Sequence, residues 1–370
     1  MDFCGNIKGI LGFGCMRLPM KDGEVDKAEF SKMIDAYMGA GFNYFDTAHG
    51  YIDGKSERAI GECLSPRYKR EDYILADKLS EWYVEKEGDI EPFLDSQLKI
   101  CGVDYFDFYL VHSVHRKNYD KFKGINAFKA LKKLKDKGKI RHIAMSFHDS
   151  AKMLDEVLSE NPEIEAVQLQ INYLDYDAPG IESKACYDVA VRHGKKVIVM
   201  EPVKGGALAD LPREAGEIFD ALGKNKSYAS YALRYAGGLP EVFMVLSGMG
   251  SIKMMEDNIS TMRDLVPLDE AELRATELVR ETIRRVSQIG CTACDYCKDV
   301  CPKGVRISES FSIYNGYVSA KALRSESKKR LLSMDVGPSE CISCGKCERV
   351  CPQGIEIREK LRAVAKKFNW

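Results

Sequence analysis

Eight of the thirteen cysteines in this 370-residue chain fall between residues 291 and 351, in two runs of identical spacing. The first run is Cys291-x2-Cys294-x2-Cys297-x3-Cys301-Pro302, and the second is Cys341-x2-Cys344-x2-Cys347-x3-Cys351-Pro352. The residues after the two prolines also correspond, because Lys-Gly-Val-Arg-Ile follows the first and Gln-Gly-Ile-Glu-Ile follows the second. The repeat indicates a small C-terminal unit built around thiolate ligands.

The spacing of each run is typical of proteins that bind two [4Fe–4S] clusters. Gaps of two residues let a tight loop bring three thiolates to one cluster, and the fourth cysteine, set off by three residues and followed by proline, points toward the other cluster. Structural zinc is the alternative, but four ligands per zinc give no reason for the doubled run. We therefore predict one cluster on Cys291, Cys294, Cys297 and Cys351, and a second on Cys341, Cys344, Cys347 and Cys301.

Residues 308–333, between the two runs, have a helical pattern and exceed the length that a minimal ferredoxin needs. The C-terminal unit is therefore predicted to be a small, mainly helical, ferredoxin-like domain with a helical insertion. The other five cysteines are scattered through the first 290 residues, and this asymmetry places the domain boundary near residue 287. The predicted domains are residues 1–286 and 287–370.

In the first domain, apolar runs of strand length alternate with helical patterns. The expected strands are residues 9–14, 42–46, 73–78, 106–112, 140–146, 166–170, 196–201 and 242–247. The expected helices are residues 26–40, 56–64, 90–101, 125–137, 150–159, 181–193, 226–236 and 252–265, with a last helix over residues 269–286. Eight βα units of this length predict an α/β fold, a closed (β/α)8 TIM barrel. An open doubly wound sheet is the alternative, but no glycine-rich dinucleotide fingerprint follows the first strand.

Charge and hydropathy indicate which kinds of partner the chain is expected to have and in which cell compartment it is expected to lie. The 55 Lys and Arg residues balance 56 Asp and Glu residues, so nothing indicates nucleic acid as a partner. No apolar run approaches the roughly 18 residues that a membrane span needs. Lys8 and Arg17 interrupt the first apolar stretch, which therefore does not read as a signal peptide. Thirteen cysteines in a chain expected to be cytoplasmic indicate metal or redox chemistry rather than disulfides.

Polar residues follow the predicted strands at the end where barrels carry their chemistry. They occur as Asp46-Thr47-Ala48-His49-Gly50-Tyr51, Asp77-Lys78, Val111-His112 and Ser146-Phe147-His148, with Gln168, Gln170 and Asn172 on the sixth strand. Together with Gly12–Pro19, Gly54–Glu57 and Leu246–Gly248, these motifs resemble the aldo/keto reductase family over about residues 5–265. The resemblance implies that Asp46, Tyr51, Lys78 and His112 form the family's catalytic tetrad.

The tetrad makes chemical sense for reduction of a carbonyl group. A free tyrosine has a pKa of about 10 and is a weak acid near neutrality. We expect Lys78 to lower the pKa of Tyr51, Asp46 to hold Lys78, and His112 to orient the carbonyl oxygen. Three of these residues also have a simpler interpretation, as a helix cap for Asp46, a packing aromatic for Tyr51 or a solvated loop residue for Lys78. His49 and His148 are secondary candidates only.

The resemblance also implies a bound nicotinamide cofactor, NADP or NAD. The implied contacts are Gly14, Cys15, Met16, Ser146, Gln168, Met200, Pro202, Gly205, Ser247, Gly248 and Asn258, although Cys15 and Met16 suit packing as well. Phe147 stands where the family commonly has asparagine, and Met200 stands where it has an aromatic residue. Gly248 and Met254 occupy the positions of the usual pair of cations, which leaves Lys253 as a substitute and weakens the case for the 2′-phosphate of NADP.

A branch of the family carries a C-terminal ferredoxin-like extension, and this chain resembles it along its full length. The shared features are Arg17-Leu18-Pro19, Ser146-Phe147-His148 and Met200-Glu201-Pro202-Val203-Lys204-Gly205-Gly206. This branch adds an expectation about fold and cofactors rather than about the substrate. Trp82, Tyr83, Tyr173 and Tyr176, in loops after the strands, are candidate walls of a substrate pocket.

Three functions fit these expectations. In the first, the chain reduces a small-molecule carbonyl substrate with a nicotinamide cofactor, and the two clusters are its electron port. A hydride carries two electrons and a cluster passes one, so this function calls for a bound flavin, for which there is no motif, or for a ferredoxin or flavoprotein partner. Alternatively, the barrel accepts single electrons for a less usual reduction. In the second, the clusters relay electrons between partners and the tetrad is vestigial. In the third, the clusters are a structural staple or an oxygen sensor of an ordinary reductase.

Overall fold

The computed structural model describes residues 6–178, 181–287, 289–291, 293–319 and 324–369. The chain forms two compact units, one of residues 1–202 and 229–268 and the other of residues 203–228 and 269–370. The second unit therefore includes two stretches that the sequence pattern groups with the barrel, residues 203–228 and 269–286. The domain boundary at residue 286 stays a prediction.

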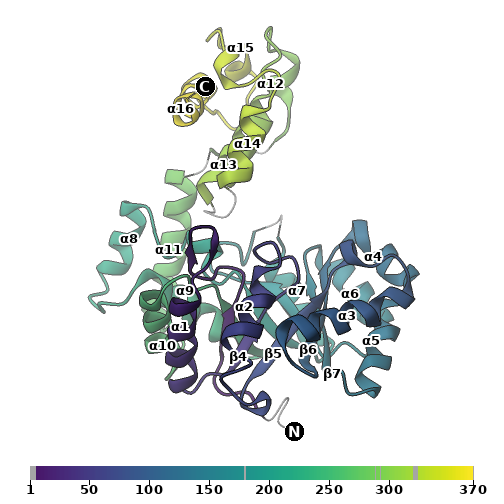
Figure 1. Ribbon diagram of the computed structural model, residues 1–370. Coiled ribbons are helices and arrows are strands. Elements are labelled where there is room, and N and C mark those ends of the chain that lie inside the picture. The colour runs from purple at the N-terminus through teal and green to yellow at the C-terminus, as the bar shows by residue number, and fades with distance from the viewer. Residues whose placement is uncertain (1–5, 179–180, 288, 292, 320–323, 370) are drawn as a thin grey trace. The chain divides into compact units, whose positions relative to one another are not determined.

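The first unit contains a closed barrel of eight parallel strands, so the predicted fold class is confirmed. The strands are β1 (Leu11–Gly14), β4 (Tyr44–Asp46), β5 (Ile74–Leu79), β6 (Phe106–Val114), β7 (Ile140–Phe147), β8 (Ala166–Gln170), β9 (Lys196–Met200) and β10 (Val242–Ser247). Each strand pairs with its neighbour along the chain, and β1 pairs with both β4 and β10 to close the ring. Figure 1 shows β4 to β7 inside a layer of helices.

The strands are buried on both faces because side chains fill the barrel and helices cover it. In β5 all six residues are buried. Tyr44, Phe108, Ile198 and Met244, from four different strands, belong to one buried cluster. This packed layer closes the interior, so polar side chains gather where the strands end.

The α-helices of the first unit agree with the predicted ranges, apart from one addition, and two short 3-10 helices, η1 (Arg70–Asp72) and η2 (Glu81–Tyr83), are added as well. The α-helices are α1 (Lys27–Gly39), α2 (Lys55–Cys63), α3 (Glu87–Cys101), α4 (Arg116–Gly124), α5 (Ala127–Asp136), α6 (Ala151–Glu160), α7 (Ser183–Arg192), α9 (Tyr228–Gly237) and α10 (Ile252–Met262). Asp26, Ser150 and Ser251 cap helices by accepting hydrogen bonds from backbone N–H groups. Helix α4 was not predicted; His115 N donates to Asn118 Oδ1 at its start.

A short hairpin, β2 (Met20–Lys21) and β3 (Glu24–Val25), was also not predicted. Asp22 and Gly23 join its strands with φ angles of 51° and 80°. Two consecutive positive φ angles match the right-handed twist of paired strands, and Asp-Gly is a favoured sequence for them.

The described part of the second unit is helical, with no strand. Its elements are η3 (Lys204–Gly206), α8 (Arg213–Asp220), α11 (Glu270–Ser287), α12 (Tyr296–Asp299), α13 (Ile307–Ser319), α14 (Arg324–Leu332), η5 (Pro338–Glu340), α15 (Lys346–Arg349) and α16 (Ile357–Phe368). Helices α13 and α14 are the predicted helical insertion, of which residues 320–323 lie outside the described residues. Among the described helices, none has the length and apolar character needed to cross a membrane.

The two cysteine runs have the same local structure. Each contains a four-residue helix, α12 or α15, before its last cysteine, and is followed by a longer helix, α13 or α16. The helices α13 and α16 pack on each other and share a core that includes Phe311, Leu361 and Val364. The second unit therefore folds as a helical pseudo-repeat around the cysteines.

Candidate active site and cluster sites

Asp46 and Lys78 form a buried ion pair at the ends of β4 and β5. Lys78 Nζ lies 2.6 Å from Asp46 Oδ1, and the two side chains are 1% and 3% exposed. Lys78 Nζ also donates to the backbone oxygen of Thr47 over 2.7 Å. Burial lowers the pKa of Lys78, but the charges of Asp46, Tyr51 and Asp77 and the hydrogen bond to Asp46 together outweigh burial, so the pKa lies above its usual value. Lys78 is therefore a fixed positive charge at neutral pH.

Tyr51 lies beside this charge. Lys78 Nζ is 4.8 Å from the centre of the Tyr51 ring. Burial raises the pKa of Tyr51, Lys78 lowers it and Asp46 raises it, and the pKa remains above 10. Lys78 acts on Tyr51 in the direction expected from the sequence, but burial outweighs it. Tyr51 is consequently protonated at neutral pH and is available as a proton donor.

His112 completes the group from β6. Its ring centre is 6.1 Å from that of Tyr51, and its Nδ1 lies 2.6 Å from the hydroxyl oxygen of Ser80. The pairing of β6 with β7 shifts register between Val111 and Val114, and Ser113 has a φ of 57°. This bulge interrupts the strand at His112, as bulges near active sites often do.

The imidazole of His112 is neutral. Burial, followed by the charge of Lys78, lowers its pKa to about 3. Because Nδ1 is engaged with Ser80, Nε2 is the ring nitrogen left for another partner. Ser80 was not among the residues singled out in the sequence, although it stands two residues after Lys78.

A network of buried polar side chains lies behind Lys78. Gln97 Nε2 donates to Glu57 Oε1 and to Asp77 Oδ1, both over 3.0 Å, and its own oxygen accepts from Tyr109. Burial and the charge of Glu57 raise the pKa of Asp77 well above its usual range. The Oδ1 of Asp77 also accepts a hydrogen bond from the backbone N–H of Lys78. His49 Nδ1 lies 2.8 Å from Glu57 Oε2, so this histidine belongs to the network behind Lys78.

Several predicted nicotinamide contacts gather at the ends of β1, β7, β8 and β10. Gln168 Oε1 is buried and has no hydrogen-bond partner among the described residues. A Cβ at Gly14 would lie 3.3 Å from the backbone oxygen of Ser247, so the glycine lets β1 approach the end of β10 closely. Ser146 accepts from Ser113 N over 2.7 Å, and Asn258 donates to Ser247 over 2.6 Å. The unpartnered amide oxygen of Gln168 fits a polar ligand that donates a hydrogen bond.

The remaining predicted contacts differ in how accessible they are. Cys15 is fully buried and its thiol approaches the backbone oxygen of Phe13, while Met16 is 53% exposed. Met200 ends β9 partly buried, and Pro202 is buried. Gly205 lies in η3, within the second unit, and stays a prediction.

Arg17 and Glu29 are charged residues near α10 that the sequence had not singled out as cofactor contacts. A Cβ at Gly248 would lie 3.6 Å from Arg17 Nη1, so the guanidinium lies against this loop. Glu29 Oε1 accepts from Ile252 N, the first residue of α10, over 3.2 Å. Lys253 and Met254 are exposed in the same turn. The start of α10 thus has an arginine on one side and a carboxylate at its N-terminus.

The aromatic candidates divide into two groups. Trp82 is 62% exposed and its ring lies 5.9 Å from that of His112, in an edge-on arrangement. Tyr83 packs on His49 and Phe93, and Tyr173 and Tyr176 both pack on Tyr235. Trp82 is the aromatic side chain that the structure places at the tetrad.

His148 lies outside the tetrad. It lines a cavity of about 440 Å³ between the ends of β7 and β8 and the starts of α6 and α7. Burial, followed by the charge of His115, lowers the pKa of His148.

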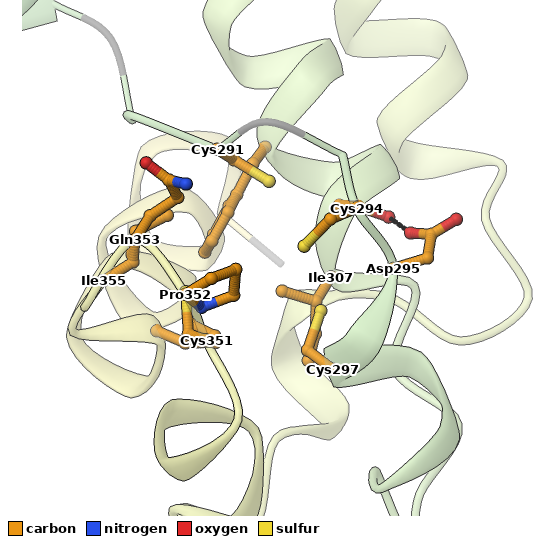
Figure 2. A pocket seen from close by; sticks show the side chains of 12 residues that line it. Cys291, Cys294, Asp295, Cys297, Ile307, Cys351, Pro352, Gln353 and Ile355 are labelled. Carbon is orange, nitrogen blue, oxygen red and sulfur yellow. Dashed lines mark hydrogen bonds between the residues drawn. The ribbon is translucent and has the colours of Figure 1, made fainter.

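The eight cysteines of the repeat line two small cavities of the second unit. Cys291, Cys294, Cys297 and Cys351 line one, and Cys301, Cys341, Cys344 and Cys347 line the other. Figure 2 shows the sulfurs of Cys291, Cys294 and Cys297 directed into the same space, with Cys351 and Pro352 across it. The structure thus brings the fourth cysteine of each run to the first three of the other run.

The spacing of these cysteines bears on the choice of metal. Among the described residues, no three Cys, His, Asp or Glu side chains are placed to hold a single metal ion. Tetrahedral zinc needs its sulfurs within about 2.3 Å of one point, whereas the four thiolates of a [4Fe–4S] cluster bind four separate irons.

Comparisons with known proteins agree with this arrangement. L-galactose dehydrogenase of Arabidopsis thaliana is 25% identical over 302 residues, 75% of this chain and 92% of that protein. An uncharacterized oxidoreductase of Bacillus subtilis is 23% identical over 298 residues, 72% of this chain and 91% of that protein.

Solved structures show the same fold. An aldo-keto reductase from Bacillus halodurans in its holo form matches with a TM-score of 0.60 and 24% identity, covering 73% of this chain and 91% of that one. One from Klebsiella pneumoniae in complex with NADPH has a TM-score of 0.59 and 19% identity, covering 73% and 90%. The profile of the Aldo/keto reductase family matches residues 10–281, and that of the 4Fe-4S dicluster domain matches residues 290–356. The chain is therefore an oxidoreductase of the aldo/keto reductase family with a C-terminal 4Fe-4S dicluster domain.

Proposed function

We propose that this chain reduces the carbonyl group of a small molecule with a nicotinamide cofactor, at a tetrad of Asp46, Tyr51, Lys78 and His112. The observation that carries the proposal is the buried Lys78 ammonium, 2.6 Å from Asp46 and 4.8 Å from the centre of the Tyr51 ring. A fixed cation beside a protonated phenol suits transfer of a proton to an oxygen that gains negative charge.

Tyr51 gives its proton to the carbonyl oxygen. A bound reduced nicotinamide would supply the hydride to the carbonyl carbon and be oxidised in the process. The phenolate left on Tyr51 is stabilised by Lys78, since the ammonium lowers the pKa that burial raises. Asp46 keeps the ammonium in place and charged.

His112 positions the substrate oxygen. Its imidazole is neutral, so a proton on Nε2 requires that Nδ1 accept a hydrogen bond. Ser80 meets this requirement when its hydroxyl donates to Nδ1 over the 2.6 Å that separates them. Nε2 then donates to the carbonyl oxygen together with Tyr51. Trp82, edge-on to His112, bounds the substrate side of the site.

For the cofactor, the residues near α10 support NADH at least as strongly as NADPH. Glu29 at the first N–H of α10 would accept a ribose hydroxyl and repel a 2′-phosphate. Arg17, which lies against Gly248, would contact the pyrophosphate that both cofactors share. Gln168 Oε1, which lacks a partner among the described residues, would accept from the carboxamide of the nicotinamide.

The two cysteine cavities would each hold one [4Fe–4S] cluster, and we assign these clusters as the electron port of the enzyme. Each cluster exchanges single electrons, whereas the tetrad serves a two-electron transfer. A bound flavin, or a ferredoxin or flavoprotein partner, would transfer electrons between the clusters and the nicotinamide cofactor. Anaerobic purification, with iron, sulfide, flavin and nicotinamide measured on one sample, decides between them: stoichiometric flavin supports an internal connection, and its absence supports a partner protein.

Replacing Tyr51→Phe tests the proposed reaction. We expect the rate of carbonyl reduction by NADH to fall about 10²- to 10⁴-fold, the usual contribution of a general acid. Binding of NADH, measured by fluorescence, should not change. Tyr68→Phe is the control, because Tyr68 donates to Asp35 on the surface. Unchanged reduction by Tyr51→Phe would refute the role of the tetrad and favour an electron-transfer protein.

A further inference from the structure

The two cluster cavities are related by the sequence repeat, but they differ in charge. Residues fifty positions apart correspond throughout the repeat, as Cys291 corresponds to Cys341. Three corresponding pairs line the cavities. The cavity of Cys291, Cys294, Cys297 and Cys351 has Asp295, Ser308 and Gln353, and the other cavity has Gly345, Arg358 and Lys303.

Two of these pairs together place an anion, Asp295, beside the first cysteine loop and a cation, Arg358, beside the second. Asp295 and Gly345 both have positive φ, 62° and 72°, directly after the second cysteine of their runs. At the first cavity the Asp295 carboxylate occupies this place and accepts a hydrogen bond from Ser308. At the second cavity Gly345 has no side chain, and a Cβ there would lie 3.6 Å from Arg358 Cζ. The missing side chain lets the guanidinium approach the cysteine loop.

Nearby counter-charges reduce this difference but do not remove it. Glu348 Oε2 lies 2.7 Å from Arg358 Nη2, so this pair is close to neutral. Lys303 has no ion-pair partner among the described residues, and Asp295 has none either. The second cavity therefore keeps one unpaired cation on its lining where the first keeps one unpaired anion.

We propose that the two clusters have different reduction potentials, and that the cluster on Cys301, Cys341, Cys344 and Cys347 has the higher one and takes the first electron. Reduction adds a negative charge to a cluster, so a nearby cation stabilises the reduced form and a nearby anion destabilises it. This inference rests on the proposed assignment of the cysteines to two clusters.

The consequence is a direction for electron flow. An electron that enters at the cluster near Asp295 moves to the cluster near Lys303, and a single electron on the protein stays there. Lys303 and Asp295 are not ligands of the clusters. Their charges shift the reduction potentials of the clusters whose cavities they line.

The test is a redox titration of the anaerobically purified full chain, followed by EPR, with iron and sulfide measured on each sample. The wild type should show two midpoints. Lys303→Gln, which installs the residue found at position 353, should lower the higher midpoint. Asp295→Asn, which keeps the hydrogen-bonding shape, should raise the lower midpoint. We expect each change to alter the equilibrium distribution of one electron between the two clusters about tenfold. This corresponds to a shift of about 59 mV in the midpoint potential of a one-electron couple.

Lys360→Gln is the matched control, because Lys360 is exposed on α16 and lines neither cavity. It should move neither midpoint. Coincident midpoints in the wild type, or a shift of the lower midpoint by Lys303→Gln, would overturn the inference while leaving the clusters in place. Absence of iron and sulfide would instead overturn the assignment of the clusters themselves.

Discussion

Lys78 holds only one of the two oxygens of Asp46: its Nζ lies 2.6 Å from Oδ1, while the buried Oδ2 has no hydrogen-bond partner among the described residues. Burial raises the pKa of Asp46, and Lys78 acts against that rise. The carboxylate therefore depends on Lys78 for its charge, and the two residues behave as one unit beneath Tyr51.

Breaking this pair should affect both stability and activity. Lys78→Met leaves Asp46 buried without a partner, and we expect the free energy of unfolding to fall by about 3–5 kcal/mol. Adding Asp46→Asn should restore part of that stability but none of the carbonyl reduction, because the cation beside Tyr51 is still missing. Urea denaturation and steady-state kinetics measure the two effects.

The control for this prediction is Lys133→Met. Lys133 also lies 2.6 Å from a carboxylate, that of Glu87, but its side chain is 67% exposed. Its loss should leave stability and activity close to those of the wild type. Equal effects of Lys133→Met and Lys78→Met would contradict the importance of burial.

The pH dependence follows from His112. Its pKa of about 3 means that the imidazole is neutral at every pH above about 4. The rate of carbonyl reduction should therefore show no inflection near the ordinary histidine pKa of about 6.5. Burial raises the pKa of Tyr51 above its ordinary value, so Tyr51 also stays protonated through the neutral range. A fall in kcat/KM centred near pH 6.5 that disappears in His112→Gln would contradict this description.

The same shift predicts a loss of stability in acid. His112 gains its proton near pH 6.5 in the unfolded chain but only near pH 3 in the folded one, so protonation favours unfolding as the pH falls between these values. His112→Gln should lose stability less steeply over this window than the wild type does. Thermal unfolding across pH 4 to 7 measures the difference in slope.

Ser80 should act through His112. Ser80→Ala removes the group that engages Nδ1, so the imidazole loses its fixed tautomer and orientation. We expect kcat to fall about tenfold or more while the affinity for NADH is kept. Ser80→Thr retains the hydroxyl and should recover most of the rate. Equal loss in both variants would indicate a packing role for Ser80 instead.

Glu29 should influence the choice of cofactor. Glu29→Gln removes a negative charge from the start of α10, so kcat/KM for NADPH should rise several-fold relative to NADH. Arg17→Ala should weaken both cofactors alike. Kinetics with both cofactors test this, and an unchanged ratio in Glu29→Gln would show that the 2′-phosphate does not approach this carboxylate.

The exchange of cysteines between the runs can be tested one ligand at a time. Cys301→Ala should disrupt the cluster on Cys341, Cys344 and Cys347, and Cys351→Ala should disrupt the cluster on Cys291, Cys294 and Cys297. The EPR spectrum of each reduced variant should keep the signal that the other one loses. Loss of the same signal in both variants would contradict the assignment.

Much of the fold could be predicted because local patterns and tertiary structure agree. The alternation of buried strands and helices indicated the barrel, and the cysteine spacing indicated which side chains would line each cavity. The hairpin around Asp22-Gly23 could also have been predicted, since Asp-Gly is a strong turn signal. Helix α4 was missed because its sequence, with four lysines and arginines, has few apolar positions to show a helical period.

The parts of the site that could not be predicted depend on the packing of residues far apart in the chain. Ser80 and His112 are 32 residues apart, and Arg17 reaches Gly248 only because β1 and β10 close the barrel. The raised pKa of Tyr51 likewise reflects burial, which the sequence motif does not reveal.

The proposed reaction is tested most directly by following the hydride itself. The holoenzyme would be incubated anaerobically with a carbonyl substrate and NADH carrying deuterium at C4 of the nicotinamide, on each face in turn. Mass spectrometry of the alcohol should find deuterium on the former carbonyl carbon with one of the two labelled cofactors, and Tyr51→Phe should slow its appearance. Alcohol formed without deuterium from either cofactor would show that the electrons arrive singly, through the clusters, and would contradict hydride transfer at the tetrad.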